Sequence, residues 1–327
     1  MLKLKNKINQ FRLTVLMCIL ALAVPAIAQE QLSIATAGTG GVYYPIGGGL
    51  AEIIKQNVDG YAATAEVTGG SVENMGLIAT GDADLAIALG DTVAQARSGT
   101  GRFKGQRLPM ISGLSSLYMN IVQIATLADS EITSLSGLKG KRVSVGAPGS
   151  GTEVNAKAIL AANGISYDDI EEQRLNFNET ADALANGDID AGFWSVAAPT
   201  SAILNLATTQ SIRMIGLNEA EIAATRAADP IFTRTSLPGG TYAGVDEDVI
   251  VVGIPNVLVV SREMPDALAY AITRALYEHL DELSAIHPAA RQVTVGFTLE
   301  TLPVPLHPGA LRYFRETGVA IPDKLLK

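Results

Sequence analysis

Two glycine-rich turns carry the residue types best suited to chemistry in this sequence. Each turn follows a short apolar segment typical of a strand and opens a segment with helical spacing. The free N–H groups at a helix start lie at the positive end of the helix dipole, and glycine lets an anion approach them closely. The pattern favours binding of a carboxylate or phosphate; tight turns without a ligand are the alternative. The turns comprise Gly38, Thr39, Gly40 and Gly41, and Gly149, Ser150, Gly151 and Thr152.

Other motifs for cofactors, metals or catalysis are missing from the sequence. Tyr43 and Val154 occupy the third glycine position of a dinucleotide fingerprint, and neither turn has the Lys-Ser/Thr of a nucleotide P-loop. Neither G-x-S-x-G nor H-E-x-x-H occurs. The three histidines are scattered and have the spacing of surface or capping residues rather than of zinc ligands. We therefore expect no catalytic residue, no metal and no cofactor.

Five further side chains are candidates for a site beside these turns. Ser71 opens a second helix, where capping alone would explain it, and Asn74 on the same first turn either faces the site or is solvated. Tyr43 and Tyr44 either line a cleft or fill the interface below their helix. Trp194 ends a strand, which makes it a ligand wall or a core residue.

Two pairs of acids precede predicted strands at equivalent places. Asp82 and Asp84 follow one helix, and Asp188 and Asp190 follow another. Because Asp and Asn favour tight turns, we interpret these acids as turn formers rather than as catalytic carboxylates.

Composition excludes several classes of protein. The 327 residues are 48% apolar and 17% charged, which rules out a disordered chain and provides a core of useful size. The net charge of −9 argues against nucleic acid as a partner, since phosphate binding needs a basic field. The single cysteine cannot form an internal disulfide or a thiolate cage.

The start of the chain, Met1–Ala28, has the pattern of a cleavable signal peptide. A basic segment precedes the apolar stretch Leu13–Val24, and Ala26-Ile27-Ala28 gives the small-x-small cleavage pattern. We predict cleavage after Ala28 and export to the periplasm. The mature chain then has no cysteine and carries −13, from 20 basic and 33 acidic residues. Met17 before Cys18 makes a lipid anchor the lesser alternative.

Strand and helix patterns alternate along the exported chain and repeat once. The first unit has strands at 32–37, 62–67 and 85–89 and helices at 42–58 and 71–80. The second has strands at 142–146 and 174–177, a further strand after Asp190, and helices at 154–162 and 179–186. Ile34 corresponds to Val143 and Gly81 to Gly187, so the offset between the units stays nearly constant. We expect two α/β lobes whose glycine-rich turns face a shared cleft at the carboxyl ends of the strands.

Two long apolar runs are predicted to join the lobes. Tyr118–Ala128 leads out of the first lobe, and Asp248–Val260, with Pro255 at a kink or edge, leads back. Pairing of these runs would form a two-strand hinge. Helices at 265–284 and 308–317 should pack on the first lobe. This gives a signal peptide at 1–28, lobe I at 29–124 and 250–327, and lobe II at 125–249.

Five segments together resemble one family. They are ATAGTGGVYYPIGGGLAEII (35–54), VTGGSVENMGLIATGDADLAIAL (67–89), SLSGLKGKRVSVGAPGSGTE (134–153), GGTYAGVDEDVIVVGIPNVLVV (239–260) and PLHPGALRYFRETG (305–318). The sequence resembles the TAXI family, the extracytoplasmic solute-binding subunits of tripartite ATP-independent periplasmic (TRAP) transporters. The likeness covers nearly all of the mature chain.

This resemblance implies a fold, a ligand class and a partner. The expected fold is a two-lobe type II periplasmic-binding-protein fold, and the expected ligand is glutamate, glutamine or a 2-oxoglutarate-like dicarboxylate. The partner would be the TRAP membrane subunit, which performs ion-coupled uptake, and we expect a monomer. The ligand-lining residues implied by the resemblance are Thr39, Gly40, Tyr43, Tyr44, Ser71, Asn74, Gly149, Ser150, Thr152, Trp194 and Tyr242.

The sequence departs from the family pattern at two turns. Leu89-Gly90-Asp91 stands where many relatives have a Gln-Ser-Asp-like turn, and Ala197-Ala198-Pro199 replaces a Gly-Tyr-Pro-like turn. Both should border the cleft, so the ligand of the relatives does not carry over directly. A subunit of an ATP-driven importer is the first alternative function. An enzyme on the same bilobal scaffold is the second, although no nucleophile–base–orienter set is present.

Overall fold

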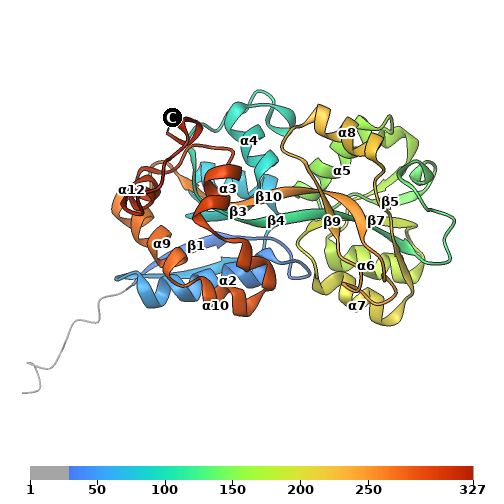
Figure 1. The fold of residues 1–327 in the computed structure, drawn as a ribbon, viewed down its shortest axis with the longest axis horizontal. Coiled ribbons are helices and arrows are strands. Elements are labelled where there is room, and N and C mark those ends of the chain that lie inside the picture. Colours follow the sequence, from blue (N-terminus) through green and yellow to red (C-terminus); the bar gives the residue numbers. More distant parts are fainter. Residues whose placement is uncertain (1–28, 327) are drawn as a thin grey trace, which may run out of the picture. The chain divides into compact units, whose positions relative to one another are not determined.

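The computed structural model describes residues 29–326 (Figure 1). The predicted signal peptide at 1–28, with Cys18, lies outside the described residues. Residues 31–327 form one compact unit. Within the described range, no helix has both the length and the apolar character that crossing a membrane requires.

A ten-stranded mixed sheet organises this unit. Its order is β2-β1-β3-β10-β4-β7-β5-β6, with β8 paired to β4 and β9 paired to β10. The strands are β1 (Glu30–Ala35), β2 (Tyr61–Glu66), β3 (Leu85–Leu89), β4 (Ile111–Leu127), β5 (Arg142–Ser144), β6 (Glu171–Gln173), β7 (Ala191–Val196), β8 (Ile212–Met214), β9 (Thr233–Leu237) and β10 (Val249–Ser261).

Helices connect the strands and cover the sheet. They are α2 (Tyr43–Asn57), α3 (Ser71–Thr80), α4 (Gly90–Ser98), α5 (Gly151–Ala162), α6 (Phe177–Asn186), α7 (Ser201–Thr209), α8 (Glu219–Ala228), α9 (Asp266–Glu278), α10 (Leu280–Ile286), α11 (Val295–Thr301) and α12 (Pro308–Glu316). Short 3₁₀ turns lie at Gly101–Phe103, Leu135–Leu138, Tyr167–Asp169, Pro288–Gln292 and Asp323–Leu325.

The sheet repeats one strand order, as the internal repeat predicted. We call residues 30–98 the first half and residues 142–209 the second half. The first half has the order β2-β1-β3 and the second β6-β5-β7, so in each the first strand is central. In each half, the first connection runs outward from the central strand to one edge strand. The second connection runs in the opposite direction, from that edge strand across the central strand to its other neighbour. Right-handed crossovers therefore place α2 and α3, and likewise α5 and α6, on opposite faces of the sheet.

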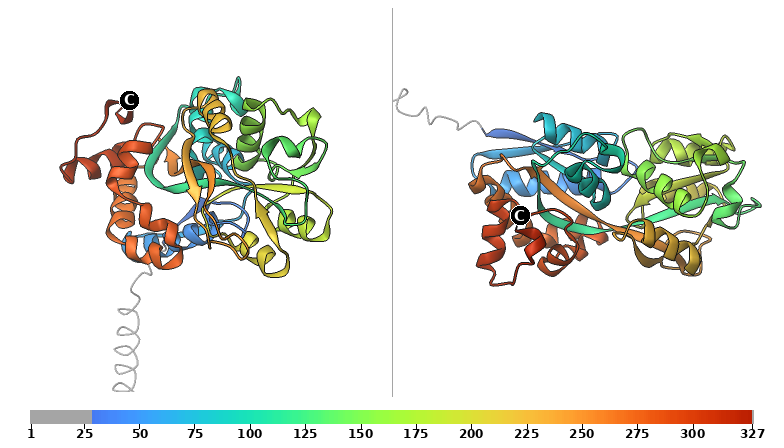
Figure 2. Two further views of the ribbon diagram at one scale, coloured as in Figure 1. Left: turned by 45° about the vertical axis from the view of Figure 1, so that its right-hand side comes forward. Right: turned by 90° about the horizontal axis from the view of Figure 1, so that it is seen from above.

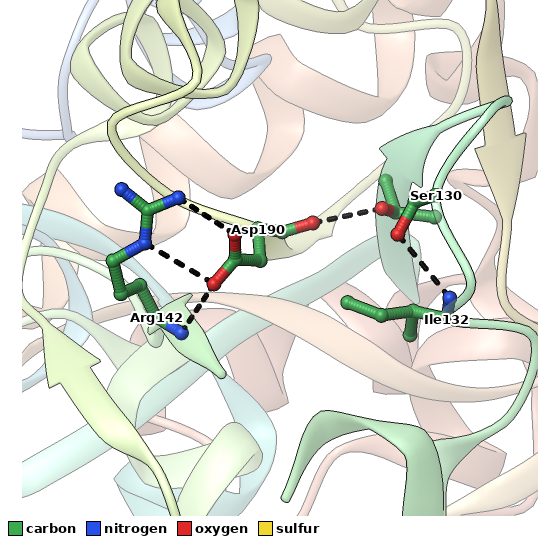
Figure 3. A network of polar contacts seen from close by, with 5 residues as sticks. Ser130, Ile132, Arg142 and Asp190 are labelled. Atoms are coloured by element: carbon green, nitrogen blue, oxygen red, sulfur yellow. Dashed lines mark hydrogen bonds and ion pairs between the residues drawn. The ribbon is translucent and has the colours of Figure 1, made fainter. Parts of the chain in front are cut away.

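The predicted turn-forming acids hold equivalent strands together in the two halves. The Asp84 carboxylate accepts the Ser33 N–H at 2.8 Å, and the Asp190 carboxylate accepts the Arg142 N–H at 2.8 Å. The Arg142 guanidinium also pairs with Asp190 at 2.7 Å (Figure 3). These hydrogen bonds hold the pKa of Asp190 below its usual range. Both acids therefore have a structural role, as the sequence indicated.

The predicted pairing of the two joining segments is confirmed. Strands β4 and β10 are antiparallel, with Gly253 opposite Ile121 and Ser261 opposite Ile111. They run between the two halves as green and orange ribbons in Figure 2. The register shifts between Pro255 and Val257. A bulge there accommodates the proline, which has no N–H to give to the ladder.

Two predicted elements are wrong. The strand expected at 174–177 lies instead at Glu171–Gln173, and Phe177 begins α6. That edge strand is polar and carries no apolar pattern, while Asn176 and Glu179 form a capping box that starts the helix early. The helix expected at 265–284 breaks at His279 into α9 and α10.

Candidate functional site

A cavity of about 400 Å³ lies where the parallel strands of both halves end. Ala37 and Ala147 line it just after β1 and β5, and Leu89 and Val196 line it as the last residues of β3 and β7. Because the carboxyl ends of strands are the usual ligand edge of an α/β sheet, this is the expected position for a binding site.

The first glycine-rich turn contributes one wall. Gly38, Gly41 and Tyr43 line the cavity, whereas Thr39 and Gly40 do not. Helix α2 starts here without a side-chain cap, since Val42 at its N-cap offers none. The first amides of α2 are therefore left without a side-chain partner beside the cavity.

The second glycine-rich turn contributes the facing wall. Ser150, Gly151 and Thr152 line the cavity, and Gly149 does not. The Ser150 hydroxyl caps α5 by accepting the Glu153 N–H at 3.1 Å. Both predicted helix starts thus reach one cavity, which is the juxtaposition the sequence repeat implied.

Ser71 lines the cavity, but Asn74 does not. Gly70, not Ser71, is the N-cap of α3, and the Ser71 hydroxyl accepts the Leu89 N–H at 3.0 Å. The Asn74 amide is fully buried and donates to the carbonyl oxygens of Thr36 at 2.7 Å and Ile87 at 2.8 Å. Asn74 therefore ties the ends of β1 and β3 together, and it is neither a lining nor a solvated residue.

A hydrogen-bonded chain runs beneath the cavity from one half to the other. The Tyr43 hydroxyl donates to the Asn256 side-chain oxygen. Asn256 donates to Asn120 at 2.7 Å, and Asn120 donates to the Ser195 carbonyl at 2.9 Å. Burial raises the pKa of the Tyr43 phenol well above its usual value, so the hydroxyl stays protonated and donates. Tyr44, which is 37% exposed, lies outside this chain and outside the lining.

Trp194 and Tyr242 belong to the protein interior. Trp194 is fully buried, and its indole N–H donates to the Phe177 carbonyl at 3.3 Å. The Tyr242 hydroxyl donates to the Gln123 side chain at 2.7 Å and accepts the Thr200 N–H at 3.1 Å. Neither lines the cavity, so their contacts are those of core residues.

Sequence reasoning missed five polar residues that line the cavity, which are Thr68, Asn120, Asn176, Glu179 and Ser195. Ser195 is 5% exposed, and its hydroxyl has no hydrogen-bond partner among the residues that the structure describes. Side chains alternate between the two faces of a strand, so Trp194 facing the core places Ser195 on the opposite face. That alternation was the available signal. Asn120, in contrast, lies within the apolar run of β4, where no pattern marks it.

The lining is largely apolar, with hydroxyl and amide side chains among the apolar residues and almost no charge. Glu179 is its only charged residue among those that the structure describes, and its carboxylate accepts the Asn176 N–H at 2.8 Å. No Arg, Lys or His of the described chain lines the cavity. Any anion bound here would be held by backbone N–H groups, hydroxyls and amides. The described residues also contain no group of acids, histidines or cysteines able to hold a metal.

A buried acid joins the two halves next to the cavity. Asp91, which follows the lining residue Leu89, is 2% exposed and accepts a hydrogen bond from Asn155 at 2.8 Å. Burial raises the pKa of Asp91 to about 7. Within residues 29–326, the Asn155 side-chain oxygen has no hydrogen-bond partner. A protonated Asp91 would supply the donor that this oxygen needs.

The fold and the family can now be stated. The cavity belongs to a mixed α/β fold with a central sheet covered by helices. The chain belongs to the NMT1-like family, whose model matches residues 34–318.

Several solved structures are similar at low identity. A putative L-cystine ABC transporter protein from Listeria monocytogenes is 14% identical, with a TM-score of 0.49 over 83% of this chain and 99% of that one. The periplasmic aliphatic sulphonate binding protein from Escherichia coli is 13% identical, with a TM-score of 0.44 over 88% and 83%. An ancestral arginine-binding protein bound to arginine is 16% identical, with a TM-score of 0.47 over 80% and 98%. At these values the similarities say nothing about this chain's ligand.

Proposed function

We propose that this protein is the extracytoplasmic solute-binding protein of a TAXI-type TRAP transporter. It captures a small carboxylate, such as glutamate or a 2-oxoglutarate-like dicarboxylate, between lobe I (29–124 and 250–327) and lobe II (125–249). It delivers the ligand to the membrane subunit for ion-coupled uptake. It works as a monomer in the periplasm after cleavage behind Ala28, without catalysis and without a cofactor. Family membership and the two equivalent α/β halves of the sheet support the binding role.

One observation carries the ligand class. The starts of α2 and α5 reach the same cavity, and the lining includes Ser195, whose buried hydroxyl has no partner among the described residues. An unpartnered buried hydroxyl is unfavourable, and a ligand oxygen would satisfy it. Helix-start amides bind a carboxylate without any formal positive charge. This explains how a cavity without a basic residue holds an acid.

The size of the cavity suits a small molecule. Its volume of about 400 Å³ lies in the range of roughly 300–1,000 Å³ that is usual for small-ligand sites. Apolar lining residues such as Val67, Pro148 and Phe177 would cover the carbon chain of the ligand.

A thermal-shift screen tests the proposal. The protein, freed of bound ligand by unfolding and refolding, is melted with C4 to C6 dicarboxylates, amino acids and neutral sugars. A ligand at 100 times its Kd should raise the unfolding free energy by about 2.7 kcal/mol, and we expect this only from carboxylates. Stabilisation by neutral sugars alone would contradict the proposed ligand class.

Two serine variants make the test specific to the cavity. Ser195 and Ser116 both have buried, unpartnered hydroxyls, but only Ser195 lines the cavity. Neither Ser195→Ala nor Ser116→Ala should lower the melting temperature of the free protein, since each removes an unsatisfied group. We expect Ser195→Ala to weaken binding of the best carboxylate about tenfold, which corresponds to a lost hydrogen bond of about 1.4 kcal/mol. Equal affinities in calorimetry would refute the role of Ser195.

A further inference from the structure

The glycine-rich turn of the second half caps a helix of the first half. The Gly149 carbonyl accepts the N–H groups of Val72 at 3.0 Å and Glu73 at 3.1 Å. Both N–H groups belong to the first turn of α3, and Gly70, the N-cap of α3, has no side chain to cap them. The free N–H groups of a helix start need a partner, and here the partner comes from the opposite half.

The turn of the first half does the same for a helix of the second half. The Gly40 carbonyl accepts the Ala202 N–H at 3.2 Å. It also accepts the hydroxyls of Thr200 at 2.9 Å and Ser201 at 3.1 Å. Thr200 is the N-cap of α7, and its side chain makes no cap bond to the helix itself. The start of α7 is therefore completed by a carbonyl of the first half.

We propose that these exchanged caps, Gly149 on α3 and Gly40 on α7, form a latch that keeps the two halves closed without a ligand. Each carbonyl lies at the positive end of a helix dipole in the opposite half. Opening would break both caps at once and return their donors to water. This proposal concerns the empty protein and does not depend on the identity of the ligand.

Steric contacts at the glycines near the latch also indicate that the two halves are closely packed there. A Cβ added at Gly69 would lie 2.6 Å from the Pro148 carbonyl oxygen of the opposite half. A Cβ added at Gly151 would lie 2.5 Å from a methyl group of Leu89 and 2.7 Å from the Ser71 hydroxyl, again across the boundary. A Cβ added at Gly38, in contrast, would meet nothing within 4 Å. Glycine is thus required where the halves touch.

These positions provide variants that oppose closure. At Gly69 the added Cβ would also lie 2.7 Å from a carboxylate oxygen of Glu73 in its own half, but that oxygen is the end of a flexible side chain that can turn away. Gly69 and Gly151 have no left-handed φ, so alanine fits their backbone. Gly151 opens α5, where alanine favours the helix. We expect Gly69→Ala and Gly151→Ala to fold and to hold the halves apart. Gly38→Ala is the matched control in the same kind of turn.

The distance between the halves tests the latch directly. The full chain with Cys18→Ser, Glu52→Cys on α2 and Asp182→Cys on α6 is spin-labelled at these two exposed helix positions and freed of ligand by unfolding and refolding. Double electron–electron resonance should give one main distance, that of the closed structure, for this background and for Gly38→Ala. Gly69→Ala and Gly151→Ala should each raise the ratio of long to short distances at least tenfold.

Two results would overturn the latch. One is a background protein that shows only a longer distance in the absence of ligand. The other is a distance distribution that Gly69→Ala and Gly151→Ala leave unchanged while circular dichroism shows both variants folded. The distance measurement uses no ligand, so it is independent of the carboxylate screen. A negative screen would not contradict the latch, and an unchanged distance distribution would not contradict carboxylate binding.

Discussion

The two halves of the molecule share a strand order but differ in how their two crossover helices, α2 and α3 or α5 and α6, begin. In the second half, Ser150 caps α5, and Asn176 with Glu179 caps α6. In the first half, α2 and α3 follow Val42 and Gly70, which offer no side-chain cap. The free N–H groups at these two helix starts therefore need partners from elsewhere. At α3 the partner is the Gly149 carbonyl of the opposite half, and at α2 we propose that it is the ligand.

The framework around these helix starts is the same in both halves. The N–H groups of Asp82 and Ala83 donate to the Leu77 carbonyl. The N–H groups of Asp188 and Ile189 donate in the same way to the Ala183 carbonyl, at the equivalent place in the second half. Each pattern follows a helix that ends in a left-handed glycine, Gly81 or Gly187. The halves thus share the backbone hydrogen bonds that follow α3 and α6, and they differ in the polar residues that cap the helices beside the cavity.

The largest expected contrast is between Asn74 in α3 and Thr180 at the equivalent place in α6. The Asn74 amide donates to three strand carbonyls, those of Ala35, Thr36 and Ile87. Thr180 shares one hydroxyl bond with Ser144 at 2.7 Å. Asn74→Ala removes all of these hydrogen bonds, although the Thr36 carbonyl keeps the Thr68 hydroxyl as a donor at 3.0 Å. It should lower the unfolding free energy by about 3 kcal/mol, against about 1 kcal/mol for Thr180→Ala.

Denaturant unfolding of the two variants measures this contrast. A loss for Asn74→Ala no larger than that for Thr180→Ala would mean that the first half does not depend on its buried amide.

The second contrast is the acid Asp91, which has Ala197 as its counterpart in the second half. Burial raises the pKa of Asp91 from 3.8 to about 7, so the native state keeps a proton that the unfolded state releases. Its contribution to stability is therefore complete below about pH 4 and is lost as the pH rises to about 7. The charged group that bears on it is Asp229, and the facing phenol of Tyr43 is neutral.

Asp91→Asn should remove this pH dependence. The new amide can accept from Asn155 and also donate to the Asn155 oxygen that has no partner. At pH 8 we expect the variant to be more stable than the parent by about 2 kcal/mol. The difference should shrink toward pH 4 in denaturant unfolding, and Asp182→Asn, on the exposed face of α6, should show no such trend. A constant difference from pH 4 to 8 would show that Asp91 does not titrate as its burial indicates.

Local patterns determine much of this fold, and this is why the sequence was informative about it. The bounds of α3 and β3 agree with those predicted at 71–80 and 85–89, since each has a clear period and a Gly or Asp at its end. The repeat also predicted two α/β units of similar plan and glycine-rich turns that face a shared cleft; the strand orders are equivalent, and Gly41 and Ser150 line one cavity.

The remaining differences from the predicted site concern residues whose carbonyl groups or side chains face other parts of the protein instead of the cavity. Gly40 and Gly149 were expected to approach a ligand, but their carbonyls face helices of the opposite half. Trp194 was a candidate for the ligand wall and Asn74 for a site residue, and both are buried in internal contacts. Spacing along one chain cannot report contacts between segments that are distant in the sequence, such as Val72 with Gly149 and Gly40 with Ala202.

The smallest expected effect tests whether α6 is self-capped while α3 is not. Asn176→Ala removes the capping box of α6, and Asn218→Ala removes the same type of box from α8, outside the repeated halves. If α6 has no other source of a cap, both variants should lose about 1 kcal/mol of unfolding free energy. If Asn176→Ala loses nothing while Asn218→Ala loses the expected amount, α6 must draw a cap from outside its own half, as α3 does. The difference between the halves would then lie in the origin of every cap and not in α3 and α7 alone.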